Sequence, residues 1–304
     1  MSRRSKLAWR VAHLSDLHVG SRLSVEEFEK IVAQCRSQQA EHLIVTGDIT
    51  HDEMSHHEGD ARAISEILLD YGYSDDRSAT VIPGNHDLHG SSGLPGDPCV
   101  TARNLPVFWR FFGRFLRRRS HMPRFPIVKR LGRLTFYCLN SICPRKSRWN
   151  FRYLFPLHQL KRLARAFRQS GNDPRIIIVH HYPYRIRLGN VRHFSLYEWF
   201  EDAFWLPLRG WRKLVGLCAR NRVRYILHGH SHSSRIVGFR GTDLVALGQG
   251  RTGEGREFSV YDIAVDGSGS RSLIRLAGDG FEVVPSRPIV PELLVDDWVE
   301  PGEC

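Results

Sequence analysis

The first 90 residues alternate short apolar runs with segments whose apolar residues recur every three or four positions. The apolar runs predict strands at 7–14, 43–45 and 80–82, and the periodic segments predict amphipathic helices at 25–38 and 61–71. Strand–helix–strand alternation with almost wholly apolar strands is typical of a buried, largely parallel sheet. This part of the chain therefore predicts an α/β fold.

The strand pattern resumes in the second half, after an interruption. We expect strands at 134–139, 176–179 and 225–227, with helices at 157–167 and 211–220 before the last two of them. From Ile236 on, glycine turns separate short β runs and predict an antiparallel meander with strands at 244–247, 258–263 and 272–276. The end of the chain is rich in proline and acidic residues, so we interpret 285–304 as an extended C-terminal tail.

Composition narrows the class of protein. With 304 residues, 41% of them hydrophobic, the chain can bury one large core, which excludes a disordered tail protein. It has no apolar run of the roughly 18–20 residues that a membrane span needs. Residues 1–12 carry positive charge but lack the apolar stretch of a signal peptide, and the six cysteines form no C-x-x-C pair. We therefore expect a cytoplasmic protein with reduced thiols and no transmembrane segment.

The positive charge is concentrated in one block. The chain has 44 Lys and Arg against 32 Asp and Glu, and residues 98–172 hold 18 of the basic residues and no acidic one. The rest of the chain, with 26 basic and 32 acidic residues, has a net charge of −6. Because a local excess of positive charge attracts anions to one surface, we expect an anionic, phosphate-containing substrate.

Candidate metal ligands follow five of the predicted strands. In chain order they are Asp16 and His18, then Asp48, then Asn85, His86 and Asp87, then His180 and His181, and finally His228, His230 and His232. Ligand crevices in open α/β sheets form at the C-terminal ends of the strands, so we expect these side chains to meet. Side chains two positions apart on an extended chain leave the same face, which would pair Asp16 with His18 and His230 with His232. Imidazole and oxygen ligands without thiolates suit Mn, Fe or Zn.

Taken in order, the motifs D-x-H, G-D, G-N-H-D, H and G-H-x-H resemble those of the calcineurin-like metallophosphoesterase family over about residues 8–250. The resemblance implies an α/β fold of the metallophosphoesterase type over residues 1–284, a β-sandwich of mixed sheets flanked by helices. It also implies an enzyme with two divalent metal ions that activate a hydroxide for in-line attack on phosphorus. Asp16, His18 and His232 would hold the first ion, Asn85, His180 and His230 would hold the second, and Asp48 would bridge them.

Neighbouring residues receive supporting roles. His86 is the candidate to protonate the leaving oxygen or to steady the phosphoryl charge. Asp87 is expected to hydrogen-bond the loop, and His180 is preferred over His181 as the ligand because it directly ends the strand. His13 and His228 are interpreted as buried structural histidines. The remaining loop histidines are interpreted as solvated, with substrate contact as the alternative for one of them: His51, His56, His57 and His89.

Residues 88–131 are interpreted as an inserted basic helical cap. Within 106–119, Phe108, Phe111, Phe112, Phe115 and Leu116 recur as one face of a helix, and arginines form the opposite face. Such a helix would either dock on the sheet through its phenylalanines, contact a membrane surface or cover a substrate, or contact nucleic acid.

Three functions follow from these patterns. The first is a metal-dependent phosphohydrolase, either a phosphodiesterase or a phosphoanhydride hydrolase, acting on a nucleotide-type phosphodiester. The second is a membrane-surface lipid pyrophosphatase of the UDP-diacylglucosamine type, peripheral on the inner membrane surface. The third is a nuclease or nucleic-acid-binding phosphoesterase, whose affinity for nucleic acid would fall steeply with salt.

Overall fold

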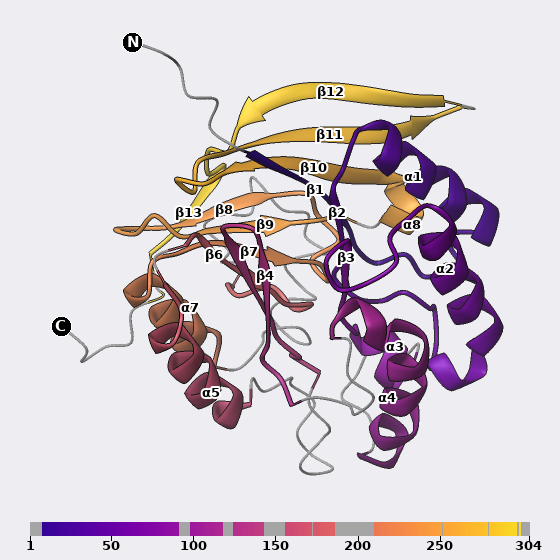
Figure 1. The fold of residues 1–304 in the computed structure, drawn as a ribbon, viewed down its shortest axis with the longest axis horizontal. Coiled ribbons are helices and arrows are strands. Elements are labelled where there is room, and N and C mark those ends of the chain that lie inside the picture. The colour runs from indigo at the N-terminus through magenta and orange to yellow at the C-terminus, as the bar shows by residue number, and fades with distance from the viewer. Residues whose placement is uncertain are drawn as a thin grey trace.

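Two mixed β-sheets form the centre of the fold (Figure 1). The computed structural model describes residues 8–90, 98–117, 124–142, 156–171, 173–185, 210–250, 252–278, 280–296 and 298. The six-stranded sheet has the order β12 (Gly280–Pro288), β11 (Gly269–Ala277), β10 (Glu257–Ala264), β1 (Ala8–Leu14), β2 (His42–Val45) and β3 (Ala79–Val81). The seven-stranded sheet has the order β13 (Leu293–Val295), β8 (Ile236–Phe239), β9 (Val245–Gly248), β7 (Val223–His228), β6 (Arg175–Ile178), β5 (Leu134–Cys138) and β4 (Ile127–Leu131).

Each sheet combines a parallel part with antiparallel neighbours. In the first sheet β1, β2 and β3 are parallel, whereas β10, β11 and β12 run antiparallel to their neighbours. In the second sheet β5, β6, β7 and β9 are parallel, and β4 and β8 pair antiparallel with β5 and β9. This arrangement confirms the predicted sandwich of mixed sheets and directs the C-terminal ends of the parallel strands toward one region.

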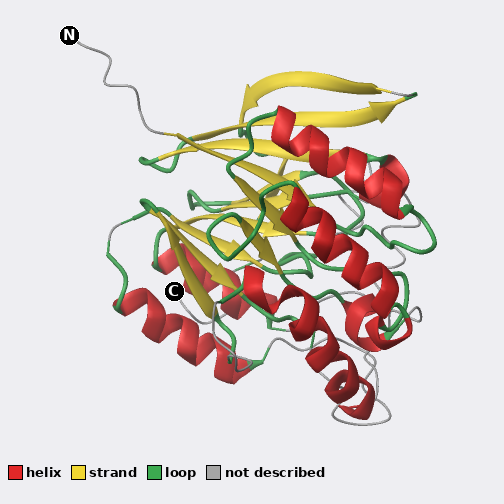
Figure 2. Cartoon of the chain, turned by 45° about the vertical axis from the view of Figure 1, so that its right-hand side comes forward, coloured by secondary structure: helices red, strands yellow, loops and turns green. Residues whose placement is uncertain are grey.

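Helices flank the two sheets on opposite sides, as Figures 1 and 2 show from two directions. One group contains α1 (Val25–Ser37), α2 (Glu58–Asp70), α3 (Asn85–His89) and α4 (Pro98–Phe112), and the other contains α5 (Leu157–Arg168) and α7 (Trp211–Arg220). The shorter helical turns are η1 (Met54–His56), η2 (Gly113–Phe115) and α8 (Thr252–Gly255). Helix α1 illustrates why these segments are helical. Ser24 and Glu27 form a capping box at its start, and its apolar face, which includes Phe28 and Ile31, is fully buried.

The basic insertion differs from the single helix that we predicted at 106–119. Helix α4 begins at Pro98, contains Pro106 in its interior and ends at Phe112, where the 3-10 turn η2 begins at Gly113. Glycine is a poor helix former, which favours the end of α4 just before Gly113. A Cβ at Gly113 would lie 2.7 Å from the Trp109 ring, so only glycine fits beside this ring without a shift. Residues 127–131 are not part of a helical cap, since they form β4 at the edge of the second sheet.

Helix α4 is docked on the body of the protein through its aromatic face. Phe108, Phe112, Phe115 and Leu116 are completely buried. On its polar side Arg103 pairs with Glu53 of the loop before η1, and Arg110 Nη1 lies 2.9 Å from Glu58 Oε2 at the start of α2. Phe108, Phe112 and Phe115 therefore belong to the core and Phe111 is partly buried against it, while two of the arginines pair with carboxylates.

Part of the segment expected as a tail is extended but paired within the sheets. Strand β12 continues to Pro288, and β13 pairs in parallel with β8. Across the described ranges, no helix combines the length and the apolar character that crossing a bilayer requires.

A buried lysine joins the edges of the two sheets. Lys129 of β4 is 5% exposed, and its Nζ donates hydrogen bonds to Ala79 O (2.6 Å), Thr80 Oγ1 (2.6 Å) and Phe115 O (2.7 Å). His42 of β2 extends this network through its Nε2, which is hydrogen-bonded to Thr80 Oγ1 at 2.8 Å. Burial lowers the pKa of Lys129 to about 8. Although Lys129 belongs to the basic block, its side chain links β4 to β3 and η2 in the interior and does not add to the charged surface.

Candidate metal centre

The predicted ligand residues meet where the parallel strands end. Asp16 and His18 follow β1, Asp48 follows β2, Asn85 begins α3 after β3, His180 follows β6, and His230 and His232 follow β7. Two groups of three residues have candidate ligand atoms within 4.8 Å of one another: Asp16, His18 and His232, and Asp48, His180 and His230. Asn85 joins the second group, because its Oδ1 lies 2.8 Å from His180 Nε2.

The ligand loops have an unusual backbone conformation. Asp16, His18, Asp48, His230 and His232 have φ values of 53°, 47°, 51°, 61° and 52°, and they are five of the eight described non-glycine residues with positive φ. The expectation that Asp16–His18 and His230–His232 lie on extended chain is therefore wrong. Left-handed conformations of non-glycine residues cost roughly 1–3 kcal/mol each and cluster at functional sites. The left-handed backbone of these loops turns their side chains toward one another.

Two glycines allow backbone to pass directly beside the carboxylates. A Cβ at Gly84 would lie 2.1 Å from Asp48 Oδ1, and a Cβ at Gly229 would lie 2.6 Å from Asp16 Oδ2. The same close approach lets His86 N donate to Asp48 Oδ1 (2.9 Å) and His230 N donate to Asp16 Oδ2 (3.0 Å). Each carboxylate is thus oriented by a backbone amide through one of its oxygens.

The second oxygen of each carboxylate provides a test of metal binding. Asp16 Oδ1 and Asp48 Oδ2 are buried and accept no hydrogen bond from the described residues. Their nearest imidazoles are at ion-pair distance, with His232 Nε2 at 3.4 Å from Asp16 Oδ1 and His180 Nε2 at 3.4 Å from Asp48 Oδ2. A buried charged oxygen without a hydrogen bond is unfavourable unless a cation satisfies it. The donor set therefore fits divalent cations.

Electrostatics favour an ionised Asp16 and neutral His18 and His230, whereas they favour a protonated His180. Burial alone raises the pKa of Asp16, but the nearby imidazole of His232 outweighs it and lowers this pKa to about 2. Burial lowers the pKa of His18 to about 4 and that of His230 well below its usual range. Burial also opposes protonation of His180, but the carboxylate of Asp48 outweighs it and raises the pKa of His180 to about 9. A bound cation would replace the proton that His180 carries in the metal-free site.

The histidine pair after β6 divides into two roles. His180 Nδ1 donates to Thr46 O at 2.6 Å, which directs its Nε2 toward Asn85 and Asp48. His181 Nδ1 is hydrogen-bonded to Ser141 Oγ at 2.8 Å, and its ring centroid lies 4.3 Å from that of His230. The structure brings His180 into the group with Asp48 and His230, whereas His181 is turned toward Ser141.

Other polar residues support the loops, as expected. Asp87 is buried and accepts hydrogen bonds from Ile49 N (2.9 Å), Thr50 N (2.9 Å) and Gly84 N (2.8 Å), so it ties the loop after β2 to the loop after β3. His13 and His228 are fully buried, and His13 Nε2 is hydrogen-bonded to Thr46 Oγ1 at 2.9 Å.

Comparison with known proteins places this site in a family. The family model described as calcineurin-like phosphoesterase matches residues 10–234. The chain belongs to the calcineurin-like phosphoesterase family. This membership confirms the predicted resemblance, identifies the protein as a metal-dependent phosphoester hydrolase, and implies two divalent metal ions.

Solved structures share the fold of this phosphoesterase at low sequence identity. A dimetal phosphatase from Danio rerio is 11% identical with a TM-score of 0.56, over 92% of this chain and 98% of that one. Purple acid phosphatase PPD1 from yellow lupin (Lupinus luteus) seeds is 10% identical with a TM-score of 0.58, over 94% of this chain and 54% of that one. GAP50, the anchor in the inner membrane complex of Plasmodium, is 12% identical with a TM-score of 0.53, over 95% of this chain and 92% of that one. No curated protein sequence matches the chain.

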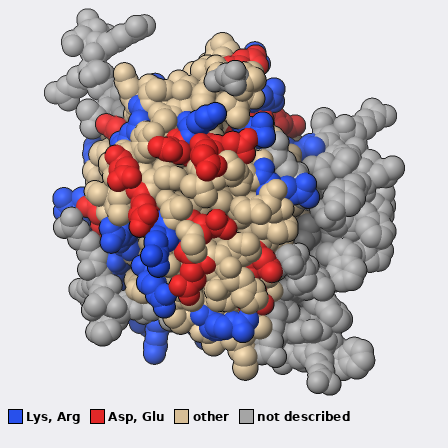
Figure 3. Space-filling model, turned by 90° about the vertical axis from the view of Figure 1, so that its right-hand side faces the viewer, with Lys and Arg blue, Asp and Glu red and all other residues tan. Residues whose placement is uncertain are grey.

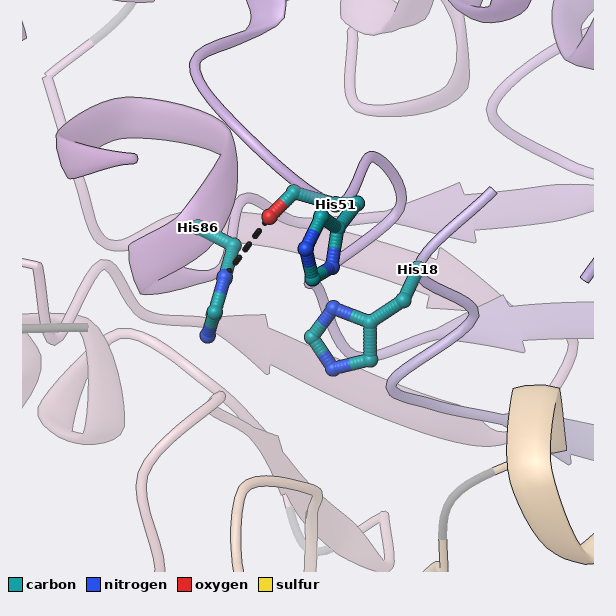
Figure 4. Close-up of side chains that lie close together, drawn as sticks. All are labelled: His18, His51 and His86. Atoms are coloured by element: carbon teal, nitrogen blue, oxygen red, sulfur yellow. Dashed lines mark hydrogen bonds between the residues drawn. The ribbon is translucent and has the colours of Figure 1, made fainter. Parts of the chain in front are cut away.

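The phosphoesterase also holds His86 beside the ligand groups. His86 Nδ1 donates to His51 O at 2.8 Å, and its ring centroid lies 4.6 Å from that of His18, as Figure 4 shows. Because a carbonyl oxygen is an acceptor, Nδ1 keeps its proton, and Nε2 is the nitrogen that gains or loses one. Sequence reasoning had interpreted His51 as a solvated loop residue. Its position three residues after Asp48 was the available signal that it lies near the site.

Proposed function

We propose that the protein is a phosphodiesterase that hydrolyses a nucleotide-type phosphodiester. The observation that carries this proposal is the pair of buried carboxylates, Asp16 and Asp48, each with one oxygen that no described residue satisfies, among converging imidazoles. The first ion would be held by Asp16, His18 and His232, the second by Asn85, His180 and His230, and Asp48 would be shared.

The protein groups have distinct tasks in this mechanism. When bound, the two divalent ions supply the positive charge that activates water and stabilises the phosphoryl oxygens. Backbone amides of His86 and His230 hold the two carboxylates in place. His86 Nε2 carries the proton delivered to the leaving oxygen, since the hydrogen bond to His51 O fixes the other ring nitrogen as a donor.

Two features of the described surface favour a nucleotide-type substrate over the alternatives. Phe108 and Phe112 of α4 are buried in the core and Phe111 is partly buried against it, which argues against a membrane-surface lipid pyrophosphatase that inserts this face into a bilayer. On the face shown in Figure 3, basic and acidic residues are interspersed. Among the described residues, Arg110 pairs with Glu58 and Arg256 pairs with Glu27. Nucleic-acid binding usually needs a continuous basic track, and the described residues on this face do not form one.

A substrate panel tests the proposal. With Mn²⁺ we expect bis(4-nitrophenyl) phosphate and cyclic nucleotides to be hydrolysed faster than an aryl monoester or a nucleotide–lipid pyrophosphate in detergent. Excess chelator should abolish the activity, and Asn85→Ala should do the same. Asn221→Ala is the matched control. Asn221 Nδ2 donates to Leu217 O at the end of α7, just before β7 begins, so it lies at the opposite end of β7 from His230. Full activity of Asn85→Ala would contradict the ligand set, and a preference for monoesters would contradict the substrate class.

A further inference from the structure

A cluster of three imidazoles lies beside the two ligand groups. His18 comes from the loop after β1, His51 from the loop after β2, and His86 from α3, and Figure 4 shows their rings converging. One ligand nitrogen from each lies within 4.8 Å of the others. The ring centroids are 4.6 Å apart for His18 and His86, 5.8 Å for His18 and His51, and 6.0 Å for His51 and His86.

Each ring in the cluster has a nitrogen available to a ligand. His18 Nδ1 and His51 Nδ1 are buried atoms that make no hydrogen bond with the described residues. His86 uses Nδ1 to donate to the carbonyl of His51, which leaves the lone pair on Nε2. Buried polar atoms are almost always satisfied, so two unsatisfied nitrogens in one cluster require an explanation.

A metal ion explains them better than an anion does. An imidazole nitrogen that bears no proton offers a lone pair to a cation and repels an anion. Three nitrogen ligands without a carboxylate suit Zn²⁺, Cu²⁺ or Ni²⁺ and bind Mn²⁺ or Mg²⁺ weakly. We propose that His18, His51 and His86 form a third metal site, selective for Zn²⁺ over Mn²⁺, and that zinc bound there inhibits the enzyme.

The inhibitory consequence rests on the proposed function, whereas zinc binding does not. Zinc on His86 Nε2 occupies the lone pair that carries the proton to the leaving oxygen. His18 is shared with the group of Asp16 and His232, so zinc in the cluster also competes for that ligand. Excess zinc should therefore stop turnover while manganese stays bound at the group that contains Asp48.

The test is a zinc titration of the Mn²⁺-loaded protein, with bound Zn²⁺ and Mn²⁺ measured after equilibrium dialysis and the hydrolysis rate measured in parallel. We expect wild type to gain zinc and to lose activity over the same concentration range. His51→Ala, which keeps the carbonyl that orients His86, should weaken this zinc binding and shift the inhibition by at least about tenfold. His56→Ala is the matched control, because the His56 side chain is 57% exposed on the neighbouring turn η1.

Rates are normalised to the zinc-free rate of each variant, and thermal melting checks that His51→Ala is folded. Equal zinc affinity of wild type and His51→Ala would overturn the proposal. Loss of both Mn²⁺ ions as Zn²⁺ binds, over the same zinc range in both proteins, would also overturn it, because the inhibition would then be exchange at the whole dinuclear centre. If the proposed function is wrong, the Mn²⁺ enzyme fails on the diester before zinc is added, and the dialysis result still decides the third site.

Discussion

Replacing the buried Lys129 by methionine should change how the stability of the protein depends on pH. Lys129 Nζ is held by three acceptors on β3 and η2, and the side chain is 5% exposed. Methionine has a similar length and no charge. The substitution therefore removes the titrating group while filling most of the same volume.

The magnitude follows from the pKa of the buried amine. Burial lowers this pKa from 10.5 to about 8, so between these pH values the unfolded chain binds more protons than the folded protein. Stability contributed by Lys129 must then rise with pH across this window. With one pKa unit worth about 1.4 kcal/mol, the full effect is about 3 kcal/mol, and about 2 kcal/mol of it falls between pH 7.5 and 9.5.

The assay is urea unfolding of wild type and Lys129→Met, in the same chelator-containing buffers, at several pH values between these limits. Other groups titrate identically in both proteins, so the difference in the free energy of unfolding isolates Lys129. We expect wild type to gain about 2 kcal/mol relative to the variant as the pH rises. A difference that stays constant with pH would show that the pKa of Lys129 is not lowered by burial in the folded protein.

Four further predictions test the site and the structure that supports it. His86→Ala should lower kcat for the diester by about 10²–10⁴-fold without changing the Mn²⁺ content, and loss of Mn²⁺ would identify His86 as a ligand of the dinuclear centre instead. In metal analysis His180→Ala should lose bound Mn²⁺, whereas His181→Ala should retain it. Gly229→Ala should destabilise the protein by at least about 1–3 kcal/mol in urea unfolding, because its Cβ would lie 1.8 Å from Ser15 Oγ, whereas Gly171→Ala, with open space around it, should not. Phe112→Ala should cost about 3–5 kcal/mol in the same assay, against less than about 1 kcal/mol for the exposed Arg110→Ala.

The parallel strands, and the position of the candidate ligand residues at their ends, were predicted from the sequence for a physical reason. Strands buried on both faces are continuous apolar runs, and the ligands directly follow them in the chain. The position of Asp48 after β2 or of His180 after β6 is therefore set by local sequence. Helices α1, α5 and α7 were predicted for a similar reason, since each buries one face with helical spacing.

The remaining features depend on partners distant in the chain. Strand β4 was missed because two of its side chains do not follow the usual rule that apolar residues are buried and charged residues are exposed. Val128 is 41% exposed, whereas Lys129 is buried against β3 and η2. The left-handed backbone at Asp16 and His230 follows from close packing of separate loops, which no periodic pattern records. The role of the His51 carbonyl likewise depends on α3 approaching from another part of the chain.

The central claim is that two metal ions bind side by side and share Asp48. The most direct measurement is the electron paramagnetic resonance spectrum of the protein loaded with Mn²⁺, together with its metal content. We predict two Mn²⁺ per chain with an exchange-coupled signal, and loss of the coupling in Asp48→Ala. One Mn²⁺ per chain, or two ions with uncoupled signals in wild type, would contradict the claim.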